Sequence, residues 1–154
     1  MAVRLHPAAL PTLVRPEARP DGVARLFDSH TLAPYLEPVR FQPGEVVIRE
    51  GAPSDDLYIV REGEVTVRLD GPRGRRLRTY GPGTIVGEVA FYLKTPRSAW
   101  VVADGTVRLD RLSGPALERM AAEQPGMLAT VHEALAALVC ERLAHSNRLI
   151  RMLT

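Results

Sequence analysis

The sequence contains very little cysteine. Cys140 is the single cysteine among 154 residues, so no disulfide can form within the chain. This composition suits a reducing compartment. Cys140 lies in an apolar helical pattern, and we expect it to be a small, buried side chain. The core is therefore expected to depend on apolar packing.

Histidines are also few, and their positions do not favour catalysis. The four histidines, His6, His30, His132 and His145, all lie outside the strand-rich segment described below. A metal-dependent enzyme built on those strands would need histidines and carboxylates clustered within them. No Gly-x-Ser-x-Gly segment occurs, and Cys140 has no evident catalytic partner. We therefore expect a protein that is not an enzyme and that has neither a metal site nor a cofactor.

Long apolar runs and runs of like charge are absent as well. No apolar stretch reaches the roughly 18 residues that would indicate a membrane span, and the N-terminus does not resemble a signal peptide. We expect the chain to be cytoplasmic, either on its own or as the cytoplasmic domain of a membrane protein. The net charge is only +2, and the arginine-rich segment 73–78 is interpreted as a solvated turn. Binding of nucleic acid by this chain alone is not expected.

The length predicts a single domain, and prolines divide it near the N-terminus. Residues 1–21 are expected to form a linker or arm, because proline at this density prevents regular helix and strand. Residues 22–154 are expected to form the domain. Its first part, residues 22–36, has a helical pattern that Pro34 and Pro38 end. The four prolines of the arm are Pro7, Pro11, Pro16 and Pro20.

Between about residues 39 and 111, short β-branched and apolar segments alternate with turn residues. The clearest segments are 46–48, 57–60 and 65–69. Short strands at this spacing predict a sandwich or a jelly-roll barrel. Residues 98–103 and 106–112 are expected to form the last hairpin, with Asp104-Gly105 in a type I′ turn.

The remainder of the chain has a helical pattern. Ser113 is a candidate N-cap for a first helix, and Pro125-Gly126 interrupts the pattern. Apolar residues then recur at three- and four-residue spacing. This periodicity predicts a long amphipathic helix over residues 126–152.

One segment, residues 87–99, carries groups that suit a phosphorylated ligand. Gly87 allows close approach of the backbone, and the following N–H groups can open a short helix whose start favours an anion. Arg97 offers a planar charged fork for phosphate oxygens. Glu88 can accept a hydrogen bond from a ribose hydroxyl, and Ser98 can add a hydroxyl donor.

The spacing of Glu88 and Arg97 allows both side chains to face one pocket. They are nine residues apart. A short helix over residues 88–94, followed by a turn at Thr95-Pro96, would bring them together. The alternative is that Glu88 merely occupies a first helical turn while Arg97 forms a surface salt bridge.

The same segment resembles the phosphate-binding cassette of the cyclic nucleotide-binding domain family. The family pattern is Phe-Gly-Glu-x-Ala, then six residues, then Arg-[Ala/Ser/Thr]-Ala. Here Val86 replaces the phenylalanine, and the rest of the pattern matches. Residues 41–51 resemble the entry into the family's barrel, and residues 55–65 resemble its next hairpin. The matching positions are Gly87, Glu88, Ala90, Arg97, Ser98 and Ala99.

The resemblance implies a mainly β fold with flanking helices. This is a β-roll or jelly-roll barrel with an N-terminal helix, a short cassette helix and a long C-terminal helix. It assigns Gly87 and Glu88 to the ribose of a bound cyclic nucleotide. Val89 belongs to the same cassette as a wall of the pocket. The residues assigned to the cyclic phosphate are Ala90, Arg97, Ser98 and Ala99.

The ligand implied is cAMP, with cGMP as the alternative, because a hydroxyl after the cassette arginine accepts either purine and favours guanine in some members. The last helix usually covers the base in this family. Tyr92 is expected in the core, Trp100 in a strand and Lys94 in solvent. Val86, Leu93 and Val101 are expected in the pocket wall or core. The candidates for covering the base are Thr130, His132, Arg142, His145, Asn147 and Arg148.

The resemblance further implies a regulatory module that passes ligand binding through its C-terminal helix to an attached effector. Residues 141–151 resemble the end of cyclic nucleotide-binding domains attached to bacterial sulfate permease-type anion transporters. A channel, another effector or a stand-alone sensor would look much the same. The alternative is a ligand-sensing fragment of a cAMP-receptor-type transcription regulator that lacks its DNA-binding module. A second copy of the chain is a further expected partner, in a homodimer formed through the C-terminal helix.

Overall fold

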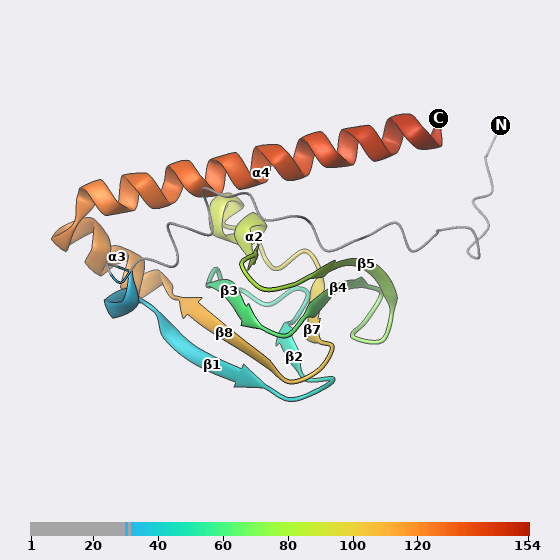
Figure 1. Cartoon of the computed structure of the whole chain (residues 1–154), viewed down its shortest axis with the longest axis horizontal. Coiled ribbons are helices and arrows are strands. Elements are labelled where there is room, and N and C mark those ends of the chain that lie inside the picture. Colours follow the sequence, from blue (N-terminus) through green and yellow to red (C-terminus); the bar gives the residue numbers. More distant parts are fainter. Residues whose placement is uncertain (1–29, 31) are drawn as a thin grey trace.

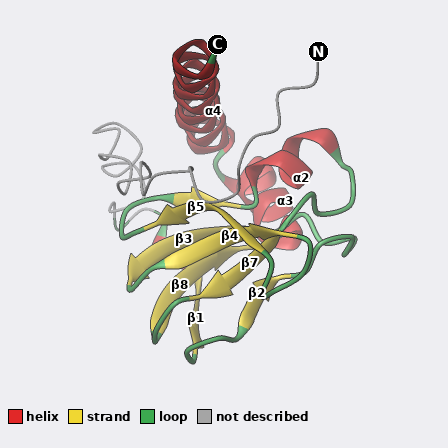
Figure 2. Cartoon of the chain, turned by 90° about the vertical axis from the view of Figure 1, so that its right-hand side faces the viewer, coloured by secondary structure: helices red, strands yellow, loops and turns green. Residues whose placement is uncertain are grey.

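Two antiparallel sheets of four strands face each other at the centre of the structure (Figures 1 and 2). The structure is a computed structural model and describes residue 30 and residues 32–154. The first sheet has the strand order β1-β8-β3-β6, and the second has the order β2-β7-β4-β5. The strands are β1 (Glu37–Phe41), β2 (Val46–Ile48), β3 (Leu57–Glu62), β4 (Val65–Leu69), β5 (Arg75–Tyr80), β6 (Ile85–Val86), β7 (Trp100–Ala103) and β8 (Val107–Leu112).

The first sheet contributes side chains to two separate hydrophobic cores, one between the two sheets and one between this sheet and the helices. In β3, Leu57 and Ile59 point to the helices, whereas Val60 points between the sheets. Successive side chains of a strand point to opposite faces, so one strand can serve both cores. The core between the sheets also includes Val65 and Val101. Both faces of this sheet are therefore covered.

Three helices complete the fold: α2 (Glu88–Leu93), α3 (Gly114–Glu123) and α4 (Pro125–Leu153). The side chain of Ser113 accepts a hydrogen bond from the Ala116 N–H at 3.2 Å, which confirms its predicted role as the N-cap of α3. Helix α4 runs along one side of the molecule above α2 (Figure 1). No helix within residues 32–154 combines the length and the apolar character needed to cross a bilayer.

Only the first half of α4 is anchored in the core. Val131, Leu135 and Leu138 are buried against α2, α3 and the first sheet. Beyond Leu138 most of the large apolar side chains of the helix are exposed, and Leu143 is 61% exposed. Cys140 is exposed, so the expectation that it is buried was wrong. It lies on α4 away from the face that packs on the core.

The mainly β fold with flanking helices is confirmed, and its strands form two sheets in place of a closed barrel. The predicted 1–21 arm lies outside the described residues, as does most of the predicted 22–36 helix. Within that helix, the described residues include a 3-10 turn, η2 (Ala33–Tyr35), and Tyr35 is buried in the helix-side core.

The predicted hairpin over residues 98–112 was wrong. Strands β7 and β8 are consecutive, but they belong to different sheets. Neither Asp104 nor Gly105 has a positive φ, which a type I′ turn requires. The Asp104 N–H instead donates to the Glu64 carbonyl at 3.0 Å, and its carboxylate accepts from the Thr66 hydroxyl. These bonds tie the connection to β4 as the chain crosses between sheets.

The segment 55–65 shows the same departure from a hairpin. Its strands β3 and β4 follow each other directly, yet β3 pairs with β6 and β8, whereas β4 pairs with β5 and β7. Alternation of consecutive strands between two sheets is the jelly-roll arrangement. Sequence spacing alone does not distinguish it from a series of hairpins.

Candidate functional site

The cassette segment connects the two sheets by way of a short helix. Strand β6 ends at Val86, and the next residue, Gly87, has a φ of 96°, which places it in the left-handed region before α2 begins. After α2 the chain returns through Arg97 to β7. The Arg97 N–H donates to the Ala52 carbonyl at 3.0 Å, and the Arg97 carbonyl accepts from the Gly51 N–H at 2.8 Å. The backbone therefore holds Arg97 in place on both sides.

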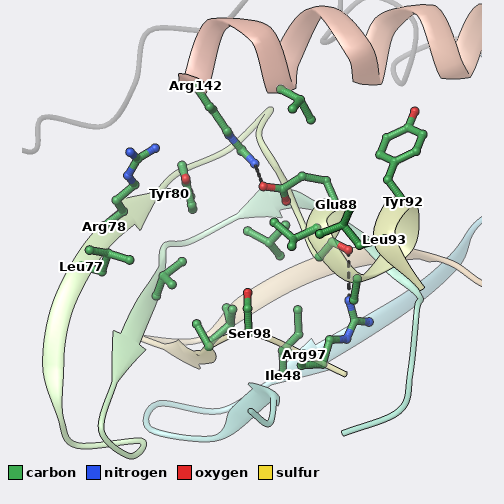
Figure 3. Close-up of a pocket in the computed structure, with 18 of the residues that line it drawn as sticks. Ile48, Leu77, Arg78, Tyr80, Glu88, Tyr92, Leu93, Arg97, Ser98 and Arg142 are labelled. Carbon is green, nitrogen blue, oxygen red and sulfur yellow. Dashed lines mark hydrogen bonds and ion pairs between the residues drawn. The ribbon is translucent and has the colours of Figure 1, made fainter. Parts of the chain in front are cut away.

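A cavity of about 540 Å³ lies between this cassette, the second sheet and α4 (Figure 3). Its size falls within the range of roughly 300–1,000 Å³ typical of small-molecule sites. Every cassette residue that the sequence analysis assigned to the ligand site lines this one cavity. These residues are Gly87, Glu88, Val89, Ala90, Arg97, Ser98 and Ala99. Their contact with a nucleotide stays a prediction.

Arg97 is a buried cation in the wall of the cavity, with 5% of its surface exposed. Its Nη1 donates to the Gly87 carbonyl at 3.1 Å, and its Nη2 donates to the Asp56 carbonyl at 2.6 Å. Burial lowers the pKa of Arg97, while the negative charge of Asp56 opposes this. An arginine nevertheless stays protonated in proteins. The cavity therefore carries a fixed positive charge suited to a monoanion.

Glu88 and Arg142 form an ion pair across the cavity. Arg142 Nη1 lies 2.6 Å from Glu88 Oε1, and both side chains are largely buried. The same guanidinium lies 4.5 Å from the centre of the Tyr80 ring and donates to the Ile85 carbonyl at 2.6 Å. The pair connects the cassette directly to α4, as Figure 3 shows.

Of the residues proposed to cover the base, Arg142 lines the cavity, and in the described part of the chain the other candidates do not. Sequence reasoning missed Val139, Leu143 and Ser146 of α4, which do line it. The signal that could have found Ser146 is its position four residues after Arg142, on the same face of a helix.

The second sheet contributes residues that the sequence did not single out. Leu77, Arg78 and Tyr80 of β5 line the cavity, and Arg78 donates from Nη2 to Ser146 Oγ at 2.6 Å. The interpretation of segment 73–78 as a solvated turn was therefore wrong from Arg75 onward, because β5 begins there. Arginine density in a short segment does not show which side chain faces inward.

The apolar residues of the cassette line the cavity, as expected for wall residues. Val86 and Val101 are buried, whereas Val89 and Leu93 are partly open to solvent. Tyr92 is 40% exposed rather than part of the core, and its hydroxyl lies 3.2 Å from His132 Nδ1. This contact joins α2 to α4 beside the cavity.

Trp100 and Lys94 lie where they were expected. Trp100 belongs to β7, with the guanidinium of Arg49 at 5.0 Å from its ring. Lys94 is exposed and pairs with Asp55 at 3.1 Å. Within residues 32–154 and residue 30, no three His, Cys, Asp or Glu side chains gather to hold a metal ion.

Replacement of Gly87 by alanine should disrupt the cassette. An added Cβ would lie 2.7 Å from the Asp56 carbonyl oxygen and 2.8 Å from Arg97 Nη1, and the positive φ adds strain of roughly 1–2 kcal/mol. We expect the thermal midpoint to fall and the binding of cyclic nucleotide to weaken by about tenfold or more. Gly44→Ala is the control, since its φ of 81° is similar but an added Cβ meets nothing within 4 Å. Equal binding by the two variants would contradict this role for Gly87.

Comparison with known proteins agrees with this geometry. The family model of the cyclic nucleotide-binding domain matches residues 38–124. The cAMP-dependent protein kinase regulatory subunit of Dictyostelium discoideum is 35% identical over 102 residues, which cover 58% of this chain and 31% of that protein. The chain thus corresponds to about a third of that relative's length.

Two solved structures are similar over most of the chain. One is a cyclic nucleotide-binding domain from Methylobacillus flagellatus KT, with a TM-score of 0.75 and 26% identity over 87% of this chain and 83% of that one. The other is the N-terminal domain of a transcriptional regulator from Streptomyces coelicolor A3(2), with a TM-score of 0.64 and 28% identity over 84% and 95% of the two chains. Together with the cavity and the matched cassette, these findings show that the chain belongs to the cyclic nucleotide-binding domain family, whose members are regulatory binding domains and not enzymes.

Proposed function

We propose that this chain is a regulatory module that binds a cyclic nucleotide in the 540 Å³ cavity and transmits binding through α4 to an attached effector. The observation that carries the proposal is that Arg97 and Glu88 line the same cavity. Helix α4 reaches this cavity through Arg142, which pairs with Glu88. Arg97 would neutralise the single charge of the cyclic phosphate, and Glu88 would accept from the ribose 2′-hydroxyl. No cofactor takes part.

The ion pair of Glu88 makes both roles compatible. An isolated carboxylate beside a phosphate would repel it, but Arg142 supplies a compensating charge 2.6 Å away. Opposite charges at this distance attract strongly in a partly buried site. The paired Glu88 keeps its capacity to accept a hydrogen bond, while its effect on the phosphate is reduced.

These contacts do not choose between cAMP and cGMP, because phosphate and ribose are common to both. The name of the Dictyostelium relative makes cAMP the first candidate. Titration calorimetry with cAMP tests the proposal, with 5′-AMP as the control that lacks the cyclic diester. We expect saturable binding of cAMP and much weaker binding of 5′-AMP. If neither cAMP nor cGMP binds the chain, the proposal is wrong.

The signalling step predicts a change in α4. A ligand shifts a conformational equilibrium only when it binds one state better than the other. Because Arg142 of α4 contacts Glu88, occupation of the cavity should alter the hydrogen-exchange protection of residues 139–153. We expect a difference between the free and the saturated protein in this segment, with little change in β8 as internal control. Identical exchange would exclude the switch and leave the binding proposal intact.

The effector would be a protein or domain attached to the module beyond α4. An attached transporter of the sulfate permease type, a channel or another cytoplasmic effector would each fit a module of this kind. The second candidate is the sensing part of a transcription regulator, which the name of the Streptomyces relative favours. The coding sequence on either side of the codons for residues 1–154 tests both, because a helix-turn-helix after α4 would favour the regulator.

The exposed side of α4 supports a homodimer as a further part of the proposal. Leu143, Ile150 and Leu153 are each more than half exposed and follow one another at spacings of seven and three residues. This spacing forms a seam suited to a second helix. Sedimentation equilibrium tests the association, and a monomer at all concentrations would exclude it.

A further inference from the structure

Three arginines and one tryptophan form a row across the second sheet. Arg68 of β4 lies directly opposite Trp100 of β7 on one side and directly opposite Arg76 of β5 on the other. The guanidinium of Arg49, the residue that follows β2, lies 5.0 Å from the centre of the Trp100 ring. These four residues, here called the arginine row, extend from the end of β2 to β5.

The arginine row lies on the face of the sheet that points away from the cavity. Val67 and Val101 line the cavity. Successive side chains of a strand point to opposite faces, so the neighbours of these valines in the row, Arg68 and Trp100, point to the other side. Both of these are half-buried, whereas the other two arginines of the row are exposed.

Arg68 and Arg76 form an unfavourable pair, because like charges directly opposite each other on neighbouring strands destabilise a sheet. Another such pair occurs in the first sheet, where Arg40 lies opposite Arg108. There Glu62 compensates the charge of Arg108 at 2.8 Å. Within residues 32–154, no arginine of the row forms an ion pair. The row therefore keeps a positive charge that an anion would stabilise.

Protection of the sheet edge explains only part of this arrangement. Charged side chains on an edge strand prevent pairing with another chain, and β5 is an edge strand of the second sheet. Arg68, however, lies on β4, which is paired on both sides by β5 and β7. A charge at this central position protects no edge.

The guanidinium groups of the row retain donors for a ligand. Arg68 donates from Nη1 to the Gly74 carbonyl at 2.9 Å, which leaves its Nη2 without a partner in the described part of the chain. Arg76 makes one long contact, 3.5 Å from Nη1 to the Thr79 hydroxyl. The Arg49 side chain makes no hydrogen bond to residues 32–154. Such planar forks match the two oxygens of a carboxylate.

We propose that the arginine row is a docking surface for an acidic segment of a partner protein. Carboxylates of the segment would pair with the guanidinium groups and remove the repulsion between Arg68 and Arg76. Tryptophan and arginine are also among the side chains that contribute most to binding at protein interfaces. Because the row lies on the face away from the cavity, docking there goes beyond the proposed function and does not depend on it.

The surroundings of the row favour a protein segment over a nucleic acid or an anionic membrane. Stacking of bases needs an accessible aromatic ring, but Trp100 is half-buried and Arg49 lies over its ring. A long polyanion would also meet the exposed carboxylates of Glu50, next to Arg49, and of Asp104, which accepts from Thr66 of β4. A short acidic segment can contact the row alone.

Fluorescence anisotropy of the full chain with a short labelled peptide of alternating glutamate and serine tests the proposal. We expect saturable binding that weakens several-fold between about 50 and 200 mM salt, because exposed charges are screened. The same peptide with glutamine in place of glutamate should not bind. Equal binding of the two peptides would overturn the proposal.

Substitutions place the binding on the row. Arg49→Gln, Arg68→Gln and Arg76→Gln should each weaken it by about threefold, as expected for an exposed ion pair, and the triple variant by about tenfold or more. Arg40→Gln is the matched control, since Arg40 is also exposed and lies opposite another arginine. This control should bind the peptide like wild type. A loss in the control equal to that in the row variants would show unspecific attraction and refute the proposal.

The thermal midpoint separates lost binding from lost structure. Arg76→Gln should not lower it, because the substitution removes a like charge opposite Arg68. A midpoint well below that of wild type would show that Arg76 stabilises the sheet, and the uncompensated charge on which the proposal rests would be disproved.

Two further titrations identify the class of partner. A single-stranded oligonucleotide and vesicles of phosphatidylcholine with phosphatidylserine should bind more weakly than the acidic peptide. If either binds more tightly and loses its binding in the triple variant, the row serves that partner and the proposal is wrong.

Binding of cAMP keeps this proposal apart from the proposed function. The triple variant should bind cAMP like wild type, because the row does not line the cavity. Failure of wild type to bind any cyclic nucleotide would refute the proposed function and leave the docking surface intact. Failure of the acidic peptide to bind wild type would refute the docking surface alone.

Discussion

Replacement of Arg97 by alanine is expected to weaken the binding of either cyclic nucleotide by about 30-fold or more. The substitution removes the fixed cation of the cavity wall. Only 5% of the surface of Arg97 is exposed, so water cannot easily take over its contacts with the ligand. A charge-assisted hydrogen bond contributes about 1.5–3 kcal/mol, and ~1.4 kcal/mol corresponds to a factor of ten in affinity. Titration calorimetry measures the loss directly, and an affinity within threefold of wild type would contradict the role of Arg97.

Two comparisons separate lost binding from lost structure. Arg97 also donates to the carbonyls of Gly87 and Asp56, so the thermal midpoint of each variant must be measured without ligand. Arg97→Lys retains a charge and should lose less affinity than Arg97→Ala. Arg119→Ala is the matched control, because Arg119 is exposed and donates to the Pro34 carbonyl far from the cavity. This control should bind like wild type.

Replacement of Arg142 by alanine is expected to lower the free energy of unfolding by about 3 kcal/mol, more than any other single substitution proposed for this chain. The ion pair with Glu88 is nearly buried, with 8% of the Arg142 side chain and 15% of the Glu88 side chain exposed. Loss of one partner leaves the other as an uncompensated charge, which typically costs about 3–5 kcal/mol. Urea denaturation of the ligand-free protein measures the change.

A double variant shows whether the buried charge causes that loss. Glu88→Gln combined with Arg142→Met removes both charges, so we expect it to be more stable than Arg142→Ala. The control is Arg108→Ala, which breaks the exposed pair with Glu62 at 2.8 Å. Exposed pairs contribute about 0–1 kcal/mol. A loss in Arg142→Ala no larger than in this control would contradict a structural role for the pair.

The local features of the site could be predicted from the sequence because they depend on neighbouring residues. The predicted short helix over 88–94 is present as α2, and Gly87 directly precedes it. Ser113 caps α3 and the long helix spans Pro125–Leu153, close to the predicted limits. Caps and apolar periodicity act over a few residues, so the sequence carries these signals directly.

Strand pairing could not be predicted in the same way. The segments 98–103 and 106–112 have the alternation and the Asp104-Gly105 sequence of a hairpin, yet the chain crosses between sheets there. Pairing depends on which distant strands compete for each edge. Strand β8 pairs with β1 and β3, which are far from it in the sequence.

The mainly β fold, the cassette and the residues that line the cavity on the side of Glu88 and Arg97 could all be predicted from residue patterns. The residues that face them across the cavity could not, because they depend on how distant elements pack. Arg78 and Ser146 are 68 residues apart, and Arg142 meets Glu88 only because α4 packs across the first sheet. Spacing predicts contacts within one element, since its geometry is regular. Contacts between elements depend on how their buried faces pack together, and no local pattern records that arrangement.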